Sequence, residues 1–457
     1  MFIFAFDFLN TTIVPLNLLP RSIDSVLAEW SLSPDHKPLL VRGARQVGKT
    51  TAIRQLATRF DHLLEVNFEE HLDVRTFFEK NLSPIEIAEN LSLYFNVPIV
   101  ENKTLLFLDE IQACIPAISS LRFFYEKMPG LHIIAAGSLL EFVMQSIPSF
   151  GVGRIRSVFM QPMSFNEFLV ALNEDRLIGQ IQDHSLEHPL PDAIHNKLVK
   201  YLRKYMVLGG MPEVIRSYVK EENILECQRI LDDLLFSYFD DFAKYKERVP
   251  AARISEIFRS VVSQLGGKFV LSHASPMSNH YQIKEALEIL IMAGLVIPVT
   301  HSSANGIPIG AEAKPNRRKM LVFDTGIANR LAGQSINEIL VADSVDFVNK
   351  GRIAELFVGL ELLKMHSPYE KSDLFFWQRE ALNSNAEIDY VIQKSGRIIP
   401  IEVKSGTKGS MQSMRIFLKE KNVQKGVRIS LENYCQYEDI VVIPLYAVGE
   451  IMKSKFI

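Results

Sequence analysis

The stretch Gly43-Ala44-Arg45-Gln46-Val47-Gly48-Lys49-Thr50 matches the pattern G-x-x-x-x-G-K-[ST] at every fixed position. The apolar run Pro38–Val41 precedes it, and Thr51–Phe60, which follows, has the character of a helix. In this order, glycines let backbone N–H groups turn inward around phosphates, and the helix presents its positive end to them. The stretch therefore predicts a phosphate-binding P-loop. The alternative is a chance match in a glycine-bearing loop.

The side chains of the loop indicate which ligand it would hold. Lys49 is expected to neutralise the β- and γ-phosphates of a nucleotide, and Thr50 to ligate Mg²⁺ through its hydroxyl group. We therefore expect ATP and Mg²⁺ as cofactors. The expected nucleotide contacts are Gly43, Ala44, Arg45, Gln46, Val47, Gly48, Lys49, Thr50 and Thr51.

A second acidic element supports this interpretation. The apolar run Leu105–Leu108 is followed by Asp109 and Glu110, which predicts a buried strand that ends in two carboxylates. Ligands of α/β sheets bind at such strand ends. Asp109 is expected to hold Mg²⁺ through its waters, and Glu110 to polarise the attacking water as general base. An ordinary strand end is the alternative for this short pattern taken alone.

Further segments predict the rest of this domain. Short apolar strands alternate with amphipathic stretches up to about residue 172, which is typical of a parallel α/β sheet. Ser138 is expected to sense the γ-phosphate, to cap a helix together with Glu141, or to do both. Arg154 and Arg156 are candidates for an arginine finger, and ordinary surface arginines are the alternative. The first expected strand ends at Val41. The other four cover Leu63–Phe68, Leu105–Leu108, His132–Ala136 and Arg156–Met160.

Composition limits the class of protein. A chain of 457 residues has room for about three domains, and an apolar fraction of 47% excludes wholesale disorder. The net charge of −3 excludes a uniformly basic nucleic-acid coat but not a local basic patch. The three widely separated cysteines exclude a disulfide scaffold or a CxxC zinc module. A reducing, cytoplasmic location is expected.

No membrane partner is expected. The longest clean apolar stretch, Ile289–Val299, is much shorter than the about 20 residues that a bilayer span needs. Met1–Pro20 is apolar but has no basic residue ahead of its apolar run, unlike a secretory signal. A loosely packed extension, or a translation start placed too early, is the expectation for this segment.

A second candidate site lies near the C-terminus. The β-like runs Ile388–Gln393 and Arg397–Val403 are separated at Ser395-Gly396. If these two residues form a hairpin loop, Lys394 pairs with Arg397, and Asp389 then faces Glu402 on the same side of the hairpin. Directly opposed carboxylates, with Cβ atoms about 5 Å apart, repel one another, and a shared cation would relieve the repulsion.

The chemistry of that pair suggests phosphodiester hydrolysis. A Mg²⁺ bridged by Asp389 and Glu402, with Lys404 beside it, would form a hydrolytic site. By the same register Glu387 faces Lys404. Glu355 lies in a helix-like run and is a candidate third acid. The alternative is a surface ion pair on a half-exposed strand.

Five segments resemble a known family. They are RGARQVGKT (Arg42–Thr50), LFLDEIQ (Leu106–Gln112), AAGS (Ala135–Ser138), GRIRSVFMQPMSFNEF (Gly153–Phe168) and GGMPEV (Gly209–Val214). They look like the prokaryotic AAA-type ATPases that carry an uncharacterised C-terminal domain. The resemblance runs from about Leu19 to the end of the chain. It implies an AAA+ nucleotide domain, then a helical region, and then a domain similar to the PD-(D/E)xK restriction-endonuclease superfamily, in which Glu355, Asp389, Glu402 and Lys404 take the catalytic positions.

The expected fold class is thus α/β with a helical middle region. His301–Arg318 is rich in Gly, Pro and Ser and predicts a linker or exposed loop. The expected parts are an N-terminal extension (1–20), an AAA+ domain (21–172), a helical region (173–250), a winged-helix-like region (251–300) and a nuclease-like domain (318–457).

Local charge suggests a polyanionic partner. Between Lys394 and Arg428 the sequence has nine basic and two acidic residues, which gives a formal charge of +7. A second basic cluster consists of Lys314, Arg317, Arg318 and Lys319. Such patches are typical of contact with DNA or RNA backbones. A solvated face balanced by acids elsewhere is the alternative.

Two functions remain open: an ATPase that drives a nucleic-acid-handling nuclease-like domain, and a non-cleaving ATP-dependent switch. Either could assemble as a homo-oligomer, with Arg154 acting within one chain or between chains.

Overall fold

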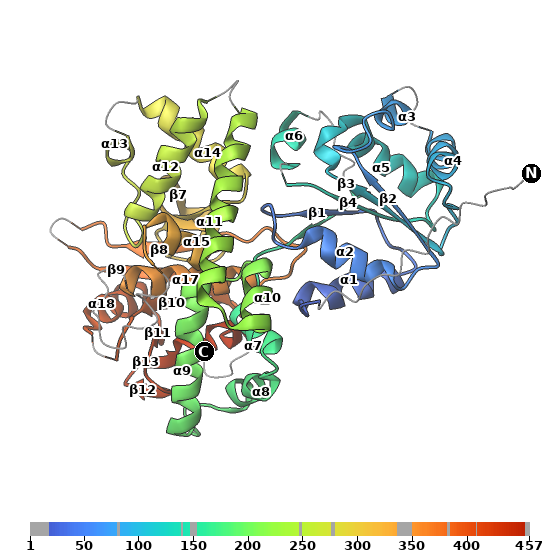
Figure 1. The fold of residues 1–457 in the computed structure, drawn as a ribbon. Coiled ribbons are helices and arrows are strands. Elements are labelled where there is room, and N and C mark those ends of the chain that lie inside the picture. Colours follow the sequence, from blue (N-terminus) through green and yellow to red (C-terminus); the bar gives the residue numbers. More distant parts are fainter. Residues whose placement is uncertain are drawn as a thin grey trace, which may run out of the picture.

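The computed structural model describes residues 18–79, 83–138, 140–146, 153–245, 249–275, 279–335, 350–381, 384–407 and 409–452. Most of the expected N-terminal extension (residues 1–17) and Lys408 of the basic patch lie outside the described residues. The chain forms two bodies, a smaller one that contains the first part of the chain and a larger one that contains the rest (Figure 1).

The smaller body is a parallel five-stranded sheet with helices on both faces (Figure 1). Its strand order is β2-β3-β4-β1-β5. The residues of β3 and β4 are all buried, as expected for strands covered on both sides. The strands are β1 (Leu39–Arg42), β2 (His62–Asn67), β3 (Thr104–Asp109), β4 (His132–Ala136) and β5 (Arg156–Phe159). All five strands predicted from the sequence are therefore confirmed.

The two faces of this sheet have separate cores. Leu39, Val41 and Phe107 pack toward α1 and α2, whereas Leu40 and Leu106 pack toward α3, α4 and α5. This alternation follows from the two-residue period of a strand. The elements outside the sheet are α1 (Ser22–Leu32), α2 (Lys49–Ala57), α3 (Arg75–Glu79), α4 (Pro84–Phe95), η1 (Ile111–Ala113), α5 (Ile115–Lys127) and α6 (Leu140–Ser146).

A helical region leads into the larger body. Its first helix begins with a capping box, in which Ser164 and Glu167 satisfy each other's backbone N–H groups. This helix packs with the helices that follow it (Figure 1), so the helical region begins before the expected boundary at residue 172. The elements are α7 (Phe165–Ala171), α8 (Asp175–Asp183), α9 (Asp192–Leu208), α10 (Pro212–Glu221), α11 (Ile224–Asp241) and η2 (Phe242–Tyr245).

The next elements are three helices and a hairpin. They are α12 (Ala251–Ser263), α13 (Leu271–Ala274), α14 (His280–Met292), β6 (Val296–Ser302), η3 (Ile309–Glu312) and β7 (Ala313–Val322). The linker or exposed loop expected at His301–Arg318 is only partly correct, because β6 extends to Ser302 and β7 begins at Ala313, so that only the segment between them connects the two strands. The strand β7 was not predicted, because Pro315 and its charged neighbours are more typical of a loop. They are tolerated because β7 is an edge strand with a bulge opposite Thr300 and His301.

The hairpin joins one large sheet with the C-terminal strands. The order is β12-β13-β11-β10-β9-β8-β6-β7, so the regions expected at 251–300 and 318–457 share a sheet. Lys394 pairs with Arg397, which confirms the hairpin register predicted for β9 and β10. The remaining elements are α15 (Thr325–Leu331), α17 (Lys350–Lys364), β8 (Leu374–Gln378), β9 (Glu387–Lys394), β10 (Arg397–Val403), α18 (Gln412–Lys421), β11 (Gly426–Ser430), β12 (Cys435–Tyr437), β13 (Ile440–Pro444) and η4 (Leu445–Glu450).

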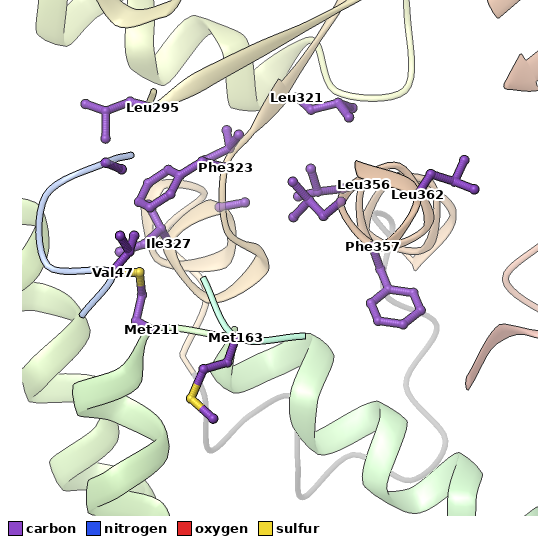
Figure 2. Close-up of a cluster of buried hydrophobic side chains, with 14 of the residues drawn as sticks. Val47, Met163, Met211, Leu295, Leu321, Phe323, Ile327, Leu356, Phe357 and Leu362 are labelled. Atoms are coloured by element: carbon purple, nitrogen blue, oxygen red, sulfur yellow. The ribbon is translucent and has the colours of Figure 1, made fainter. Parts of the chain in front are cut away.

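The two bodies share a buried apolar core. Figure 2 shows Val47, from the P-loop, beside Met211 and the side chains of Phe323 and Ile327. Val47, Met211 and Ile327 are completely buried. The phosphate-loop candidate is thus packed against the larger body. Among the described residues, no helix is long and apolar enough to cross a membrane.

Candidate functional site

The P-loop candidate has the backbone that its glycines predict. It connects β1 to α2, and Gly43 and Gly48 have φ angles of 146° and 97°. A Cβ atom at Gly43 would lie 2.2 Å from the carbonyl oxygen of Met160, so only glycine fits there. Gly48 is the N-cap of α2, which begins at Lys49. The positive end of the helix therefore faces the concave side of the loop.

Lys49 spans this concave side. Its Nζ donates to the carbonyl oxygens of Gly43 at 3.0 Å and Ala44 at 2.8 Å. The side chain is almost fully buried. Two of the three ammonium N–H groups are used in this way, which leaves one to contact an anion in the cradle.

The hydroxyl and the carboxylate that are predicted to hold Mg²⁺ lie next to each other. Thr50 donates from Oγ1 to Oδ2 of Asp109 at 3.0 Å. The other carboxylate oxygen of Asp109 accepts from the backbone N–H of Glu110 at 3.0 Å. Hydroxyl and carboxylate oxygens are the ligands that Mg²⁺ prefers, so this pair fits the ion. Because β4 lies between β1 and β3, Ser138 follows the strand between the two motifs.

The site is electrostatically prepared for a charged ligand. Burial lowers the pKa of Lys49 to about 8, although Glu110 and Asp109 partly oppose this effect. Burial also raises the pKa of the Asp109 carboxyl, against the hydrogen bonds from Glu110 and Thr50. Both charges therefore lack part of the solvation that they would have in water. A triphosphate with its cation would supply the missing partners.

Glu110 has a partner that the sequence analysis did not single out. It adopts a left-handed backbone conformation, with φ of 49°, and its Oε2 accepts from the side-chain amide of Gln112. Gln112 lies against Gly137 after β4, where a Cβ atom would clash with Oε1 of Gln112. The general-base candidate is thus held by a neighbouring amide. The segment that contains Gln112 resembles a family motif, but nothing in its sequence indicates this contact.

Neither arginine-finger candidate lies at the nucleotide site of its own chain. Arg156 begins β5 level with Leu39, at the start of β1, so it lies at the sheet edge opposite the P-loop. Its guanidinium stacks on Tyr369 at 5.2 Å from the ring centre. Arg154 is half-exposed and pairs with Glu126. A role for either arginine in a neighbouring subunit stays a prediction.

A different arginine supports the loop. Arg21 donates to the carbonyl oxygens of Val47 at 3.0 Å and Gln161 at 2.8 Å, and to Glu167 at 3.1 Å. Its side chain is 9% exposed. It therefore ties the P-loop to the start of α7. Sequence analysis missed Arg21 because the residue lies outside any motif.

The larger body also contacts the loop through α11. Arg45 pairs with Asp241 at the end of this helix. One turn before, the hydroxyl of Tyr238 donates to the carbonyl oxygen of Arg45 at 3.0 Å. Tyr238 is buried. These contacts and the burial of Val47 fix two residues of the loop, Arg45 and Val47, to the larger body.

A cleft of about 800 Å³ opens beside the loop between the two bodies. Arg42, Gly43 and Ser138 line it from the smaller body, and Lys364 and His366 line it from the larger body. It borders the first residues of the P-loop rather than the start of α2. The cleft therefore provides space next to the cradle, on the side where the bodies meet.

The C-terminal acids lie together, but around a lysine. Nζ of Lys319, on β7, is 2.9 Å from Oε1 of Glu355, 2.5 Å from Oε1 of Glu387 and 3.7 Å from Oδ1 of Asp389. The aromatic ring of Phe376 lies 5.3 Å from the same nitrogen. The lysine side chain is 2% exposed. Sequence analysis placed Lys319 in a basic surface cluster, and this assignment is wrong.

The predicted partners on β10 lie next to this cluster. Lys404 forms an ion pair with Glu402 at 2.8 Å, as in the alternative given for this strand. Asp389 uses Oδ2 to accept from the backbone N–H of Val403 at 2.8 Å. Burial raises the pKa of Glu402, with Lys404 opposing and Asp389 adding to the rise. Its Oε2 is buried and has no hydrogen-bond partner.

This arrangement does not fit the expected Mg²⁺ at Asp389 and Glu402. Among the described residues, no group of three or more His, Cys, Asp or Glu side chains is arranged to hold a metal ion. Burial, and then repulsion by Asp389, raise the pKa of Glu355 to about 7, while Lys319 opposes the rise. The carboxylates are thus already engaged by an ammonium group.

The basic patches are largely neutralised within the chain. Lys314 and Arg317 both pair with Glu380, and Arg318 pairs with Glu288. In the longer patch, Arg428 is buried and pairs with an acid four residues away. The formal charge of +7 therefore overstates what the surface presents to a partner.

Comparisons with known proteins agree with the first site. A family model described as an AAA domain matches residues 35–169, which contain the P-loop, Asp109 and Ser138. This part of the chain is therefore similar to an AAA domain. Two domains of unknown function match later parts of the chain, DUF8612 at residues 199–338 and DUF4143 at residues 350–448. No curated protein matches the chain.

Matches among solved structures are distant. A Walker-type ATPase of Pyrococcus abyssi is 14% identical, with 69% of this chain and 96% of that chain covered and a TM-score of 0.45. Cdc6p of Pyrobaculum aerophilum is 11% identical, with 73% and 97% covered and a TM-score of 0.26. The Orc1 protein of Aeropyrum pernix, solved in complex with DNA, is 13% identical, with 71% and 93% covered and a TM-score of 0.26. These likenesses are too distant to carry an argument about function.

Proposed function

We propose that this chain is a Mg²⁺-dependent ATPase whose nucleotide state is transmitted from the P-loop to the larger body. Nucleotide binding by the AAA-type domain is the part that the family match supports. The proposal concerns the residues that act and the coupling between the bodies. The observation that carries it is the joint geometry of Lys49, Thr50 and Asp109.

In this proposal each group has one role. Lys49 neutralises the β- and γ-phosphates with its remaining N–H group, and the N-terminus of α2 adds its positive end. Thr50 and Asp109 would hold Mg²⁺, which when bound offsets phosphate charge. Glu110 orients and deprotonates the attacking water. Ser138, after the strand between the two motifs, contacts the γ-phosphate.

Coupling to the larger body follows from how the loop is held. Phosphates entering the cradle must be met by the backbone N–H groups of residues 43–48, and these residues are tied to the larger body through Val47, Arg45 and the Tyr238 hydroxyl. Any change in loop shape therefore displaces contacts that belong to α11 and to the core around Phe323. This favours the switch over a nucleotide domain that acts alone.

We further propose that the larger body receives this signal with a winged-helix-like unit and a nuclease-like unit. The order α12, a single bridge between Lys268 and Lys319, α13, α14 and the β6–β7 hairpin supports the first. The register of β9 and β10, with acids on one face, supports the second. The engaged carboxylates favour a binding role over a cleaving one.

Nucleic acid is the proposed partner, because Arg397, Lys419 and Lys425 are exposed on β10, α18 and the turn after it. Filter retention of labelled DNA and RNA with and without ATP tests this part. Retention that falls steeply with salt is expected for phosphate contacts. Retention of neither polymer in either nucleotide state would overturn the partner but not the ATPase.

ATP turnover by purified full-length variants tests the main proposal. Lys49→Ala should abolish ATP binding. Glu110→Gln should keep binding and lose turnover by at least about 100-fold, the usual range for a general base. The matched control is Glu101→Gln, an exposed residue before β3 at the opposite edge of the sheet, with turnover as in the wild type. Undiminished turnover in Glu110→Gln would remove the assigned base.

A further inference from the structure

The acidic cluster of the C-terminal sheet contains its own cation. Glu355 comes from α17, and Glu387 and Asp389 come from β9, yet all three direct a carboxylate oxygen at one nitrogen, Nζ of Lys319. An ammonium group has three N–H donors. Lys319 can therefore donate to Glu355 and Glu387, while Asp389 at 3.7 Å contributes an electrostatic attraction.

The lysine cannot leave the cluster by a side-chain rotation alone. Its side chain is 2% exposed, and the ring of Phe376 covers the nitrogen. Its backbone is paired with Val299 on β6 and bridged to Lys268 on the other side. Withdrawal would require β7 to separate from its neighbours. It would also leave the buried carboxylate of Glu355 and the partly buried carboxylates of Glu387 and Asp389 without this counter-charge, which is destabilising.

A divalent cation would need the same oxygens. Mg²⁺ demands oxygen ligands at about 2.1 Å in near-octahedral geometry. Asp389 has one oxygen bound to the Val403 N–H and the other turned toward Lys319. The neighbouring acid, Glu402, is paired with Lys404. The positive charges of Lys319 and Lys404 add to the obstacle, because an incoming Mg²⁺ would be repelled by both.

We propose that Lys319 is the resident cation of this site, and that its ammonium group takes the place that a divalent metal ion would otherwise occupy among Glu355, Glu387 and Asp389. The site is then a fixed ionic cluster that joins α17, β7 and β9. It binds no catalytic metal in the wild-type protein. This inference does not depend on the ATPase proposal, since none of these residues contacts the P-loop.

Binding of Mn²⁺, measured by calorimetry on the nucleotide-free full-length protein, tests this assignment. The wild type and Asp389→Asn should give the same isotherm, because the wild type has no metal at this site. Lys319→Met keeps the length of the side chain and removes the charge, and it should gain a Mn²⁺ site. That gain should disappear in Lys319→Met combined with Asp389→Asn.

Two further variants keep the test decisive. Lys314→Met changes an exposed lysine on the same strand that pairs with Glu380, and it should behave as the wild type. If Lys319→Met does not fold, adding Glu387→Gln removes the excess negative charge and leaves Glu355, Asp389 and Glu402 as ligands. Mn²⁺ binding by the wild type that Asp389→Asn abolishes would overturn the proposal. Failure of a folded Lys319 variant to gain a site would overturn it as well.

Discussion

Lys49 makes nucleotide binding a proton-linked reaction. Its pKa is lowered to about 8 by burial in the nucleotide-free protein, whereas a free lysine titrates near 10.4. The sign follows from the ligand: phosphates favour the charged ammonium, so binding raises this pKa and takes up a proton. Uptake is therefore small where Lys49 is already charged, below its pKa, and grows as the pH rises through it.

The expected size follows from the fraction of neutral Lys49. With a pKa of about 8, binding should take up about 0.1 proton at pH 7, about 0.5 at pH 8 and about 0.9 at pH 9. Above pH 7 the terminal phosphate of the nucleotide is already ionised, so it contributes little. Affinity should accordingly weaken with increasing pH above 8.

Calorimetry in buffers of different ionisation enthalpy measures this uptake directly. A non-hydrolysable ATP analogue avoids turnover. Lys49→Arg keeps a permanent charge and should show no uptake, whereas Lys103→Ala, an exposed lysine before β3, should match the wild type. Binding heats that do not depend on the buffer at pH 9 would refute the reasoning, because Lys49 would then be charged before the ligand arrives.

Three further predictions concern the contacts that hold the loop and the larger body. Val47→Ala removes two fully buried methyl groups and should lower the free energy of unfolding by about 2 kcal/mol in urea denaturation. Tyr238→Phe removes the hydrogen bond to the Arg45 carbonyl and should cost about 1 kcal/mol in the same assay. Asp324 caps α15 and accepts from the buried Gly210 N–H at 2.6 Å, so Asp324→Ala should lower the melting temperature. Asp324→Asn, which keeps an acceptor oxygen, should lower it less, and equal losses would show that the cap is not the cause.

The N-terminal sheet could be predicted from sequence because its signals are local. Apolar runs such as Leu105–Leu108 end in residues that function requires, and the ends of parallel strands lie at one edge of the sheet, where Asp109 meets Thr50. The β9–β10 hairpin was predictable for the same reason, because a two-residue turn fixes every pair. In each case, the residues on which the prediction depends lie close together in the sequence.

The missed features depend on distant parts of the chain. Lys319 is separated from Glu355 by 36 residues, and β7 was hidden by Pro315 and by charges that usually indicate solvent. Arg21 and Gln112 carry no motif, and their roles arise only from folding. Arg154 and Arg156 were chosen by analogy with a function, whereas the start of β5 turns Arg156 toward the opposite sheet edge.

The burial of Val47 limits how this protein can be divided or recombined. A fragment that ends before α7 would expose this valine to water at the tip of its own phosphate cradle. In a hybrid that carries the smaller body of another protein, the loop would pack against residues of the larger body that do not match its shape. Swapping either half should therefore require compensating substitutions in the other.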